Sequence, residues 1–197
     1  LDASRLNKPY ICCMVKKNIA LLAGGYTGEY QVSLKSAENI ERELDKNNYN
    51  VYKIIVELNS WYYTDANGQK HLVDKNDFSL SLPNETIHFD AAFITIHGTP
   101  GEDGKLQGYF DLLHIPYNTC DTTTAALTMN KAYTKAVVQN IPNLFTAKSI
   151  TLFKHTLKPV QLIIDQLQFP LFIKPNNGGS SVGMSKVNQA SELETAL

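Results

Sequence analysis

The sequence has few cysteines, no long apolar run and no excess of charge of either sign. Its three cysteines, Cys12, Cys13 and Cys120, fit neither a disulfide framework nor a zinc site, and they predict reduced thiols in a cytoplasmic protein. The net charge of -1 gives no attraction to nucleic acid or to an anionic membrane surface. The longest apolar runs have the length of a strand, so no membrane-spanning segment is expected. These absences leave an ordinary globular protein.

The first residues lack the signs of a leader. The stretch "LDASRLNKPYICCMV" has neither a basic start nor a long apolar run, so a signal peptide is not predicted. The periodic pattern begins only after Met14. We therefore expect residues 1–13 to be an extension outside the fold, with Met14 as the natural start.

Apolar runs alternate with helical spacings along the first 130 residues. Strands are expected at 17–23, 51–58 and 89–98, and helices at 32–45, 106–113 and 122–140. A hairpin is expected at 61–73, where Asn67-Gly68 is a turn signal, and residues 74–88 are expected to make an excursion over the surface. The alternation predicts an α/β domain over residues 14–130 with an open, mostly parallel sheet.

The pattern changes beyond Pro142. We expect a strand at 147–153, a helix at 160–167, and two strands around a glycine-rich loop between residues 170 and 187. Residues 131–197 are therefore expected to form a partial, mixed α+β second domain.

Ligands in open α/β sheets bind beyond the carboxyl ends of strands, where the loop "AGGYTGEYQVS" lies. Its glycines allow a tight turn, but the spacing is not that of a dinucleotide-binding loop. Its unusual member is Glu29. This carboxylate can cap the following helix, or it can hold the ammonium group of a substrate.

A second loop of this kind is "HGTPGEDGKLQG". His97 directly follows an apolar run, so it can bind a ligand or transfer a proton, or it can be a structural histidine. Glu102 and Asp103 can be acid/base groups or metal ligands, but caps of the helix from Leu106 are the favoured interpretation.

The third loop lies within "FPLFIKPNNGGSSVGMSKV". Gly178 and Gly179 permit positive φ, and Ser180, Ser181 and neighbouring amides can cradle an anion near Lys174. A plain hairpin turn is the alternative. Lys131 in "MNKAYTK" is either a solvated helical lysine or a phosphate contact at a domain junction.

Four stretches together carry a resemblance to a known family. They are "GGYTGEYQVSLKS", "HGTPGEDGKLQGYFDLLHIPYNTC", "ALTMNKAYTK" and "FPLFIKPNNGGSSVGMSKV". In this order and spacing, the chain from about Lys16 to Val187 resembles the D-alanine–D-alanine ligases of the ATP-grasp superfamily. That resemblance implies ATP-dependent joining of two D-alanines through an acyl phosphate for the bacterial cell wall, with magnesium, in a cytoplasmic homodimer.

The resemblance also implies roles for individual residues. Glu29 and His97 match residues of the D-alanine pocket. Ser180 matches a serine that hydrogen-bonds to the glutamate, so the implied catalytic residues are Glu29, His97 and Ser180. The residues implied in ATP-phosphate binding are Lys131, Lys174, Gly179, Ser180 and Ser181. No metal ligand is implied in this chain.

Some positions depart from the family pattern. Asn130 stands where an aspartate is usual, and Tyr30-Gln31 replaces charged residues. Family members also continue past residue 197 with the adenine pocket, the magnesium ligands and a catalytic tyrosine. We therefore expect these residues alone to be an incomplete, inactive part of the enzyme. The alternatives are a D-alanine–D-lactate type ligase and a non-catalytic binding or assembly module.

Overall fold

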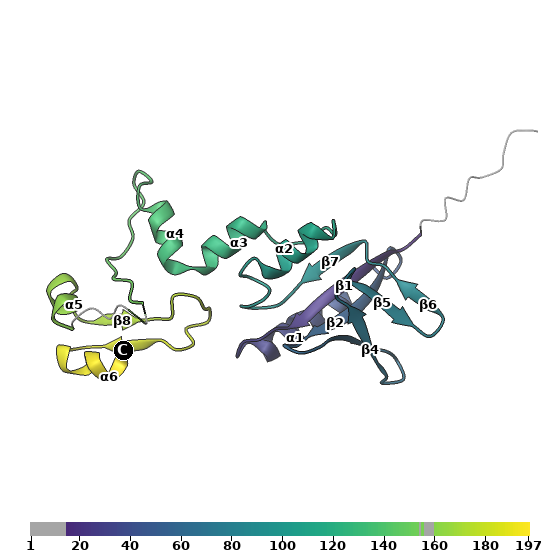
Figure 1. Ribbon diagram of the computed structural model, residues 1–197, viewed down its shortest axis with the longest axis horizontal. Coiled ribbons are helices and arrows are strands. Elements are labelled where there is room, and N and C mark those ends of the chain that lie inside the picture. The colour runs from purple at the N-terminus through teal and green to yellow at the C-terminus, as the bar shows by residue number, and fades with distance from the viewer. Residues whose placement is uncertain (1–14, 154, 156–159) are drawn as a thin grey trace, which may run out of the picture.

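The computed structural model describes residues 15–153, 155 and 160–197 (Figure 1). The extension expected at residues 1–13 lies outside this part. Two bodies are seen in Figure 1, a sheet at one end and a smaller body that holds the C-terminus at the other. Three helices follow one another between them: α2 (Lys105–Leu112), α3 (Thr122–Met129) and α4 (Lys131–Val138). No helix among the described residues is long and apolar enough to cross a membrane.

The sheet is built around three parallel strands. They are β1 (Lys17–Gly24), β2 (Tyr49–Val56) and β7 (Ala91–Ile94), with β1 in the middle. Helix α1 (Tyr30–Glu43) connects β1 to β2. The three predicted strands and the crossover helix are confirmed. Because β1 runs in the same direction as both neighbours, the loops after β1, β2 and β7 meet at one edge of the sheet.

Four antiparallel strands extend the sheet beyond β2. They are β3 (Trp61–Thr64), β4 (Lys70–Asp74), β5 (Ser79–Leu82) and β6 (Glu85–Ile87). The predicted hairpin at 61–73 is confirmed as β3–β4. The surface excursion predicted at 74–88 is wrong, because Leu80 and Ile87 from β5 and β6 are buried in the core. The α/β class is thus confirmed. The sheet is mixed rather than mostly parallel, because four of its six strand pairings are antiparallel.

Both faces of the parallel strands are covered. Side chains alternate along β1, so Ala20 and Leu22 face one side and Leu21 and Ala23 the other. The first pair packs in the large cluster that includes Phe110 of α2 (Lys105–Leu112). The second pair packs with α1. Helices α1 and α2 therefore lie on opposite faces of the parallel strands, and the candidate site lies near the first residues of these two helices.

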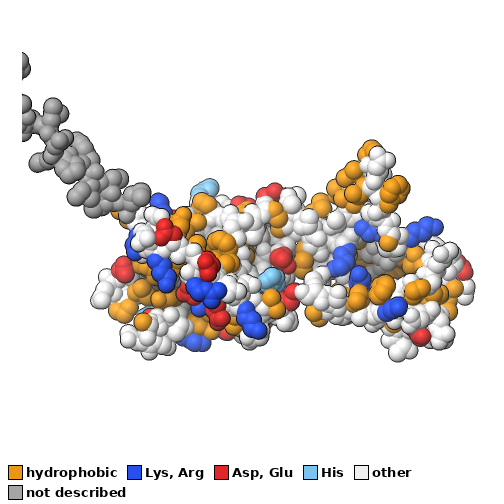
Figure 2. Space-filling model, turned by 180° about the vertical axis from the view of Figure 1, so that it is seen from behind, with side chains coloured by type: hydrophobic (Ala, Val, Ile, Leu, Met, Phe, Trp, Pro, Cys, Tyr) orange, Lys and Arg blue, Asp and Glu red, His pale blue; other side chains and the backbone are white. Residues whose placement is uncertain are grey.

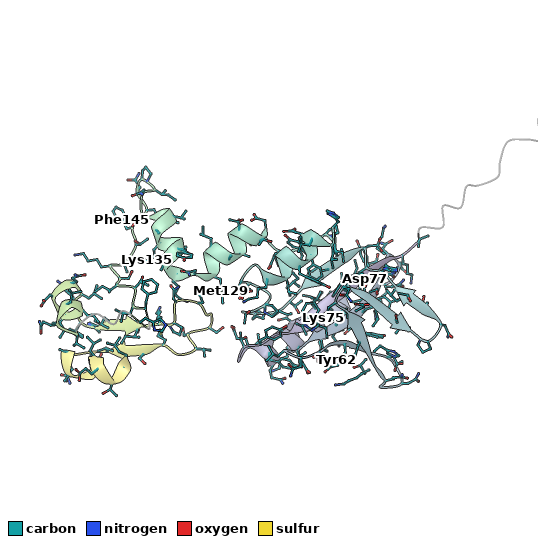
Figure 3. All side chains as sticks on the ribbon, in the orientation of Figure 1. Tyr62, Lys75, Asp77, Met129, Lys135 and Phe145 are labelled. Carbon is teal, nitrogen blue, oxygen red and sulfur yellow. The ribbon has the colours of Figure 1, made fainter. Side chains whose placement is uncertain are left out.

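The predicted helix at 122–140 is broken at Asn130. Helices α3 (Thr122–Met129) and α4 (Lys131–Val138) meet there, and Asn130 Oδ1 accepts a hydrogen bond of 3.0 Å from the Tyr133 amide. An asparagine favours this N-cap role because its short side chain reaches the free amides of a new helix. The apolar residues Tyr133 and Val137 of α4 are exposed, and the next loop carries Phe145, 94% exposed and labelled in Figure 3. Figure 2 shows hydrophobic side chains gathered on the protrusion that this loop forms.

The smaller body has its own apolar cluster around Ile163, Leu171, Val187 and Leu193. Its elements are α5 (Val160–Gln166), β8 (Leu171–Ile173), β9 (Ser185–Val187), the 3-10 helix η2 (Ala190–Glu192) and α6 (Leu193–Ala196). The predicted helix and strand pair are confirmed. The strand predicted at 147–153 is wrong, because within the described residues β8 pairs only with β9 and offers that segment no ladder.

Candidate functional site

The loop after β1 places Glu29 at the start of α1. Gly24 and Gly25 both have φ of +101°, and a Cβ on Gly25 would lie 2.6 Å from Cγ2 of Ile96. Glycine therefore allows this loop to approach the one after β7 closely. Glu29 occupies the N-cap position, but its side chain makes no capping hydrogen bond. The interpretation of Glu29 as a helix cap is wrong, and its carboxylate is free for another contact.

That contact comes from the other end of the chain. Ser180 Oγ donates a hydrogen bond to Glu29 Oε1. The approach is close along the backbone as well, since a Cβ on Gly179 would lie 3.2 Å from Glu29 Oε2. Figure 1 shows the β8–β9 loop reaching from the smaller body toward the start of α1. The structure thus brings together two of the residues predicted for the site.

The β8–β9 loop bends at its two serines. Ser180 has φ of 47° and Ser181 of 59°, and the Val182 amide donates to the Gly179 carbonyl at 3.2 Å. Positive φ at both central residues makes this a type I′ turn. Positive φ was expected at Gly178 and Gly179. Gly178 has φ of 153°, whereas Gly179 is not among the positive-φ glycines. Within the described part of the chain, the amides of Gly179, Ser180 and Ser181 have no hydrogen-bond acceptor.

Of the two predicted lysines, Lys131 contacts the β8–β9 loop from α4, and Lys174 is the first residue of that loop. Lys131 Nζ donates to the Gly178 carbonyl at 2.6 Å. The Lys131 amide donates to the Asn176 carbonyl at 3.1 Å, and the Ala132 amide to Asn176 Oδ1 at 2.9 Å. Asn176 therefore ties the start of α4 to the loop. Lys174 follows β8, is exposed, and has its Nζ 5.7 Å from the centre of the Phe172 ring.

His97 lies in the loop after β7 and is half-buried. Its carbonyl accepts a hydrogen bond of 3.0 Å from Thr27 Oγ1 in the β1 loop. Glu102 accepts one of 2.7 Å from the Gly98 amide. Since Gly104 is the N-cap of α2 and provides no side-chain cap, the helix-cap prediction is wrong for Glu102. Asp103 forms an ion pair with Lys105. Its Oδ1 also accepts a long hydrogen bond of 3.5 Å from the Lys105 amide at the start of α2, so Asp103 is the member of the pair that contacts the helix end as predicted.

The chain is similar to known proteins in sequence and in structure. A family model described as "D-ala D-ala ligase N-terminus" matches residues 18–120, and one described as "D-ala D-ala ligase C-terminus" matches residues 135–197. The chain belongs to the D-alanine–D-alanine ligase family. It is 44% identical over 183 residues to the D-alanine–D-alanine ligase of Parabacteroides distasonis, covering 93% of this chain and 55% of that protein. The chain therefore spans about half the length of the curated relatives it matches.

Solved structures are similar as well. D-alanyl-alanine synthetase A from Vibrio cholerae has a TM-score of 0.80 at 28% identity, over 93% of this chain and 55% of that one. The VanG D-Ala:D-Ser ligase from Enterococcus faecalis has a TM-score of 0.77 at 30% identity, over 92% and 58%. A D-alanine–D-alanine ligase from Bacillus anthracis complexed with ATP has a TM-score of 0.68 at 27% identity, over 91% and 53%.

The carboxylate that directly follows β2 contacts two tyrosines, one of which is Tyr30, the residue after Glu29. Glu57 Oε1 accepts hydrogen bonds of 3.2 Å from both Tyr30 and Tyr62. Burial, together with the hydrogen bond to Glu57, raises the pKa of Tyr30 to about 12. Tyr30 is therefore a neutral donor at ordinary pH and joins the first turn of α1 to the end of β2. Figure 3 shows Tyr62 on the sheet.

Lys135 belongs to a different region. On α4 it donates to the Ala147 carbonyl and to Ser149 Oγ, beside a hollow of about 690 Å³ between α4 and residues 146–151 (Figure 3). None of the site residues predicted from the sequence lines this hollow. Lys135 thus holds the following segment against α4.

Sequence reasoning missed three residues that organise the site: Thr27, Glu57 and Asn176. Each acts on a segment distant in sequence. Thr27 and Asn176 each stand two positions from a predicted ligand residue, Glu29 and Lys174 respectively, whereas Glu57 does not. Among the described residues there is also no group of three His, Cys, Asp or Glu side chains suited to a metal ion.

Proposed function

We propose that this protein joins two D-alanine molecules to D-alanyl-D-alanine at the expense of ATP, for the bacterial cell wall. The observation that carries the proposal is the hydrogen bond from Ser180 to Glu29. It brings a carboxylate suited to an amino acid against a loop suited to phosphate. A ligase that activates an amino acid with ATP needs these two functions side by side, because proximity replaces an encounter between free reactants.

Glu29 and His97 are assigned to the first D-alanine. The carboxylate of Glu29 accepts the charged hydrogen bonds of the D-alanine ammonium group, which are stronger than those between neutral groups. His97 is half-buried in the adjoining loop. Its backbone is held to the Glu29 loop, so its ring lines the same pocket in our assignment.

The β8–β9 loop and the two lysines are assigned to the phosphates of ATP. The amides of Gly179, Ser180 and Ser181 lack an acceptor among the described residues, and successive free amides attract an anion. Lys131 and Lys174 are exposed and add positive charge. Lys131 donates one proton to Gly178 and keeps two others for a phosphate oxygen. The residues present therefore fit a nucleotide phosphate.

The proposed reaction has two steps. A carboxylate oxygen of the first D-alanine attacks the terminal phosphorus of ATP, giving an acyl phosphate and ADP. The amino group of the second D-alanine then attacks the acyl carbon, forms the peptide bond and releases phosphate. In the first step Glu29 holds the ammonium group, while the loop amides and lysines stabilise charge on the transferred phosphoryl group. Ser180, which lies in the phosphate loop and donates a hydrogen bond to Glu29, aligns the D-alanine with the phosphoryl group.

Magnesium is implied by the resemblance, but the residues described do not form a site for it. We assign its ligands to other parts of the protein and give it no step in this mechanism. We also propose that residues 14–130 and 131–197 belong to separate domains, supported by their separate apolar clusters. The active form is proposed to be a homodimer, and light scattering of the purified protein tests this.

The activity is tested with the complete protein that contains this chain. Phosphate release is measured with ATP and D-alanine, and the dipeptide product is identified by mass spectrometry. L-alanine serves as the matched control substrate. Formation of D-alanyl-D-alanine only with D-alanine and ATP supports the proposal, and no D-alanine-dependent phosphate release from a folded protein would refute it.

A second function differs only in the second substrate. One similar solved structure is a D-Ala:D-Ser ligase, and a D-alanine–D-lactate type was the alternative expected from the sequence. Both use a first D-alanine, so Glu29 and His97 keep their roles. Competition of D-serine or D-lactate with D-alanine as second substrate separates the three, and we expect D-alanine to be preferred.

A further inference from the structure

One hydroxyl group joins the two loops that carry Glu29 and His97. Thr27 Oγ1 donates a hydrogen bond of 3.0 Å to the His97 carbonyl, 70 positions away in the sequence. The same oxygen accepts one of 3.3 Å from the Glu29 amide. A hydroxyl is suited to this place because it donates and accepts at once.

The packing around Thr27 leaves room for little else. Thr27 is half-buried, and a Cβ on Gly98 would lie 2.6 Å from its Cγ2 methyl group. Gly98 has φ of +73°, and its amide is held by Glu102 at 2.7 Å. The methyl group of Thr27 therefore fits against the bare backbone of Gly98, which fixes the direction of the hydroxyl.

A second link between the loops does not depend on a side chain. The Tyr26 amide donates to the Thr99 carbonyl at 3.0 Å. Loss of the Thr27 hydroxyl leaves this backbone link available, so the loops stay adjacent. What it removes is the hydrogen bond to the His97 carbonyl and the one from the Glu29 amide.

We propose that Thr27 is a positioning residue, whose hydroxyl fixes Glu29 relative to His97 so that both contact the first D-alanine. This inference rests on the proposed function. Glu29 is the N-cap residue, and its carbonyl accepts from the Ser33 amide at 3.0 Å. Its amide is held only by Thr27 among the described residues. Without the hydroxyl, the Glu29 amide loses its acceptor. Among the described residues, Glu29 is then held by Ser180 and by the backbone bonds of the turn alone, so its carboxylate is less closely fixed relative to His97.

Two variants isolate the hydroxyl. Thr27→Val keeps the branched shape and removes the hydroxyl, whereas Thr27→Ser keeps the hydroxyl and removes the methyl group. Thr64→Val, at an exposed residue of β3, is the matched control. In the complete protein we expect Thr27→Val to raise the KM for the first D-alanine about tenfold, as for the loss of one hydrogen bond.

The pattern of kinetic change separates positioning from general damage. In Thr27→Val, kcat is expected to stay within about threefold, because the interaction lost is a binding one. Thr27→Ser is expected to restore the KM, and Thr64→Val to leave it unchanged. An unchanged KM in Thr27→Val, or an equal defect in Thr27→Ser, would overturn the inference.

A measurement without substrate separates this inference from the proposed function. Hydrogen exchange of the Glu29 amide, followed by NMR in the same proteins, is expected to be several-fold faster in Thr27→Val and unchanged in Thr27→Ser. If the wild-type protein does not use D-alanine, the proposed function fails, and slow exchange that depends on the hydroxyl still supports the link to Glu29. Equal exchange in Thr27→Val and the wild type overturns that link whatever the activity.

Discussion

Ser180 and Glu29 are 151 positions apart in the sequence and are joined by a hydrogen bond. Ser180 adopts a positive φ of 47° at this contact. A left-handed conformation costs a serine roughly 1–2 kcal/mol, so the turn persists because neighbouring contacts hold it. The contact to a charged carboxylate is of the strength needed to do so.

Replacing Ser180 tests this contact. In Ser180→Ala we expect kcat/KM for D-alanine in the complete protein to fall about 10-fold to 100-fold, as for the loss of a hydrogen bond to a charged group. Ser81→Ala, at an exposed residue of β5, is the matched control and is expected to behave as wild type. Equal steady-state kcat/KM values for Ser180→Ala and Ser81→Ala would contradict a functional link between Ser180 and Glu29.

Glu29→Gln tests the charge of the carboxylate. The amide keeps the size and one acceptor oxygen but loses the negative charge that attracts an ammonium group. We expect the KM for the first D-alanine to rise by about 100-fold, with a much smaller change in the KM for ATP. Glu38→Gln, on the exposed side of α1, is the control. If the KM for ATP rose more than the KM for D-alanine, the assignment of Glu29 to D-alanine would be wrong.

Lys174→Ala tests the nucleotide side. Lys174 is exposed and follows β8, where its loss leaves the fold intact. We expect the KM for ATP to rise about tenfold or more, since a charge-assisted contact to phosphate is lost. Lys35→Ala on α1 removes the same charge away from the β8–β9 loop and serves as control. An ATP titration in which both variants match the wild type would remove Lys174 from the assignment.

The sequence predicted elements whose signal is local. β1, β2 and β7 were predicted because continuous apolar runs mark buried parallel strands. β5 and β6 were missed because each is short and buries few side chains, such as Leu80 and Ile87. The break at Asn130 was missed because asparagine lowers helix stability only slightly, while its value as a cap depends on the next helix.

The residues of the candidate site also divide into those with a local sequence signal and those that depend on the folded structure. Glu29, His97 and Ser180 were predicted because they lie in recognisable motifs. The bond from Glu102 to the Gly98 amide was not predicted, since it depends on how the whole loop folds. Thr27 was missed for the same reason, because its partner His97 is reached only after two strands have paired.

The core gives a prediction that does not depend on catalysis. Phe110 is 0% exposed and packs edge-on against Phe78, with ring centres 4.8 Å apart. Phe110→Ala is expected to lower the free energy of unfolding by about 3–5 kcal/mol. Phe145→Ala, at a ring 94% exposed, is the control and should change it by no more than about 0.5 kcal/mol. Trp61 lies in the Phe110 cluster, so its fluorescence during urea unfolding reports the difference.

Tyr30 gives a prediction for alkaline pH. Its phenol is neutral when protonated, and burial together with Glu57 raises its pKa to about 12 from an ordinary value of 10.0. The folded state therefore binds this proton more tightly than the unfolded state. The resulting stabilisation is complete below about pH 10 and is lost as the pH rises toward about 12.

The titration of Tyr30 is measured by tyrosinate absorbance. When the curve of Tyr30→Phe is subtracted from that of the wild type, one phenol should titrate near pH 12. Glu57→Gln should move that midpoint to lower pH, because it removes the negative charge beside the phenol. A difference curve centred at the ordinary tyrosine pKa, in a protein still folded at that pH, would show that neither burial nor Glu57 raises the pKa of Tyr30.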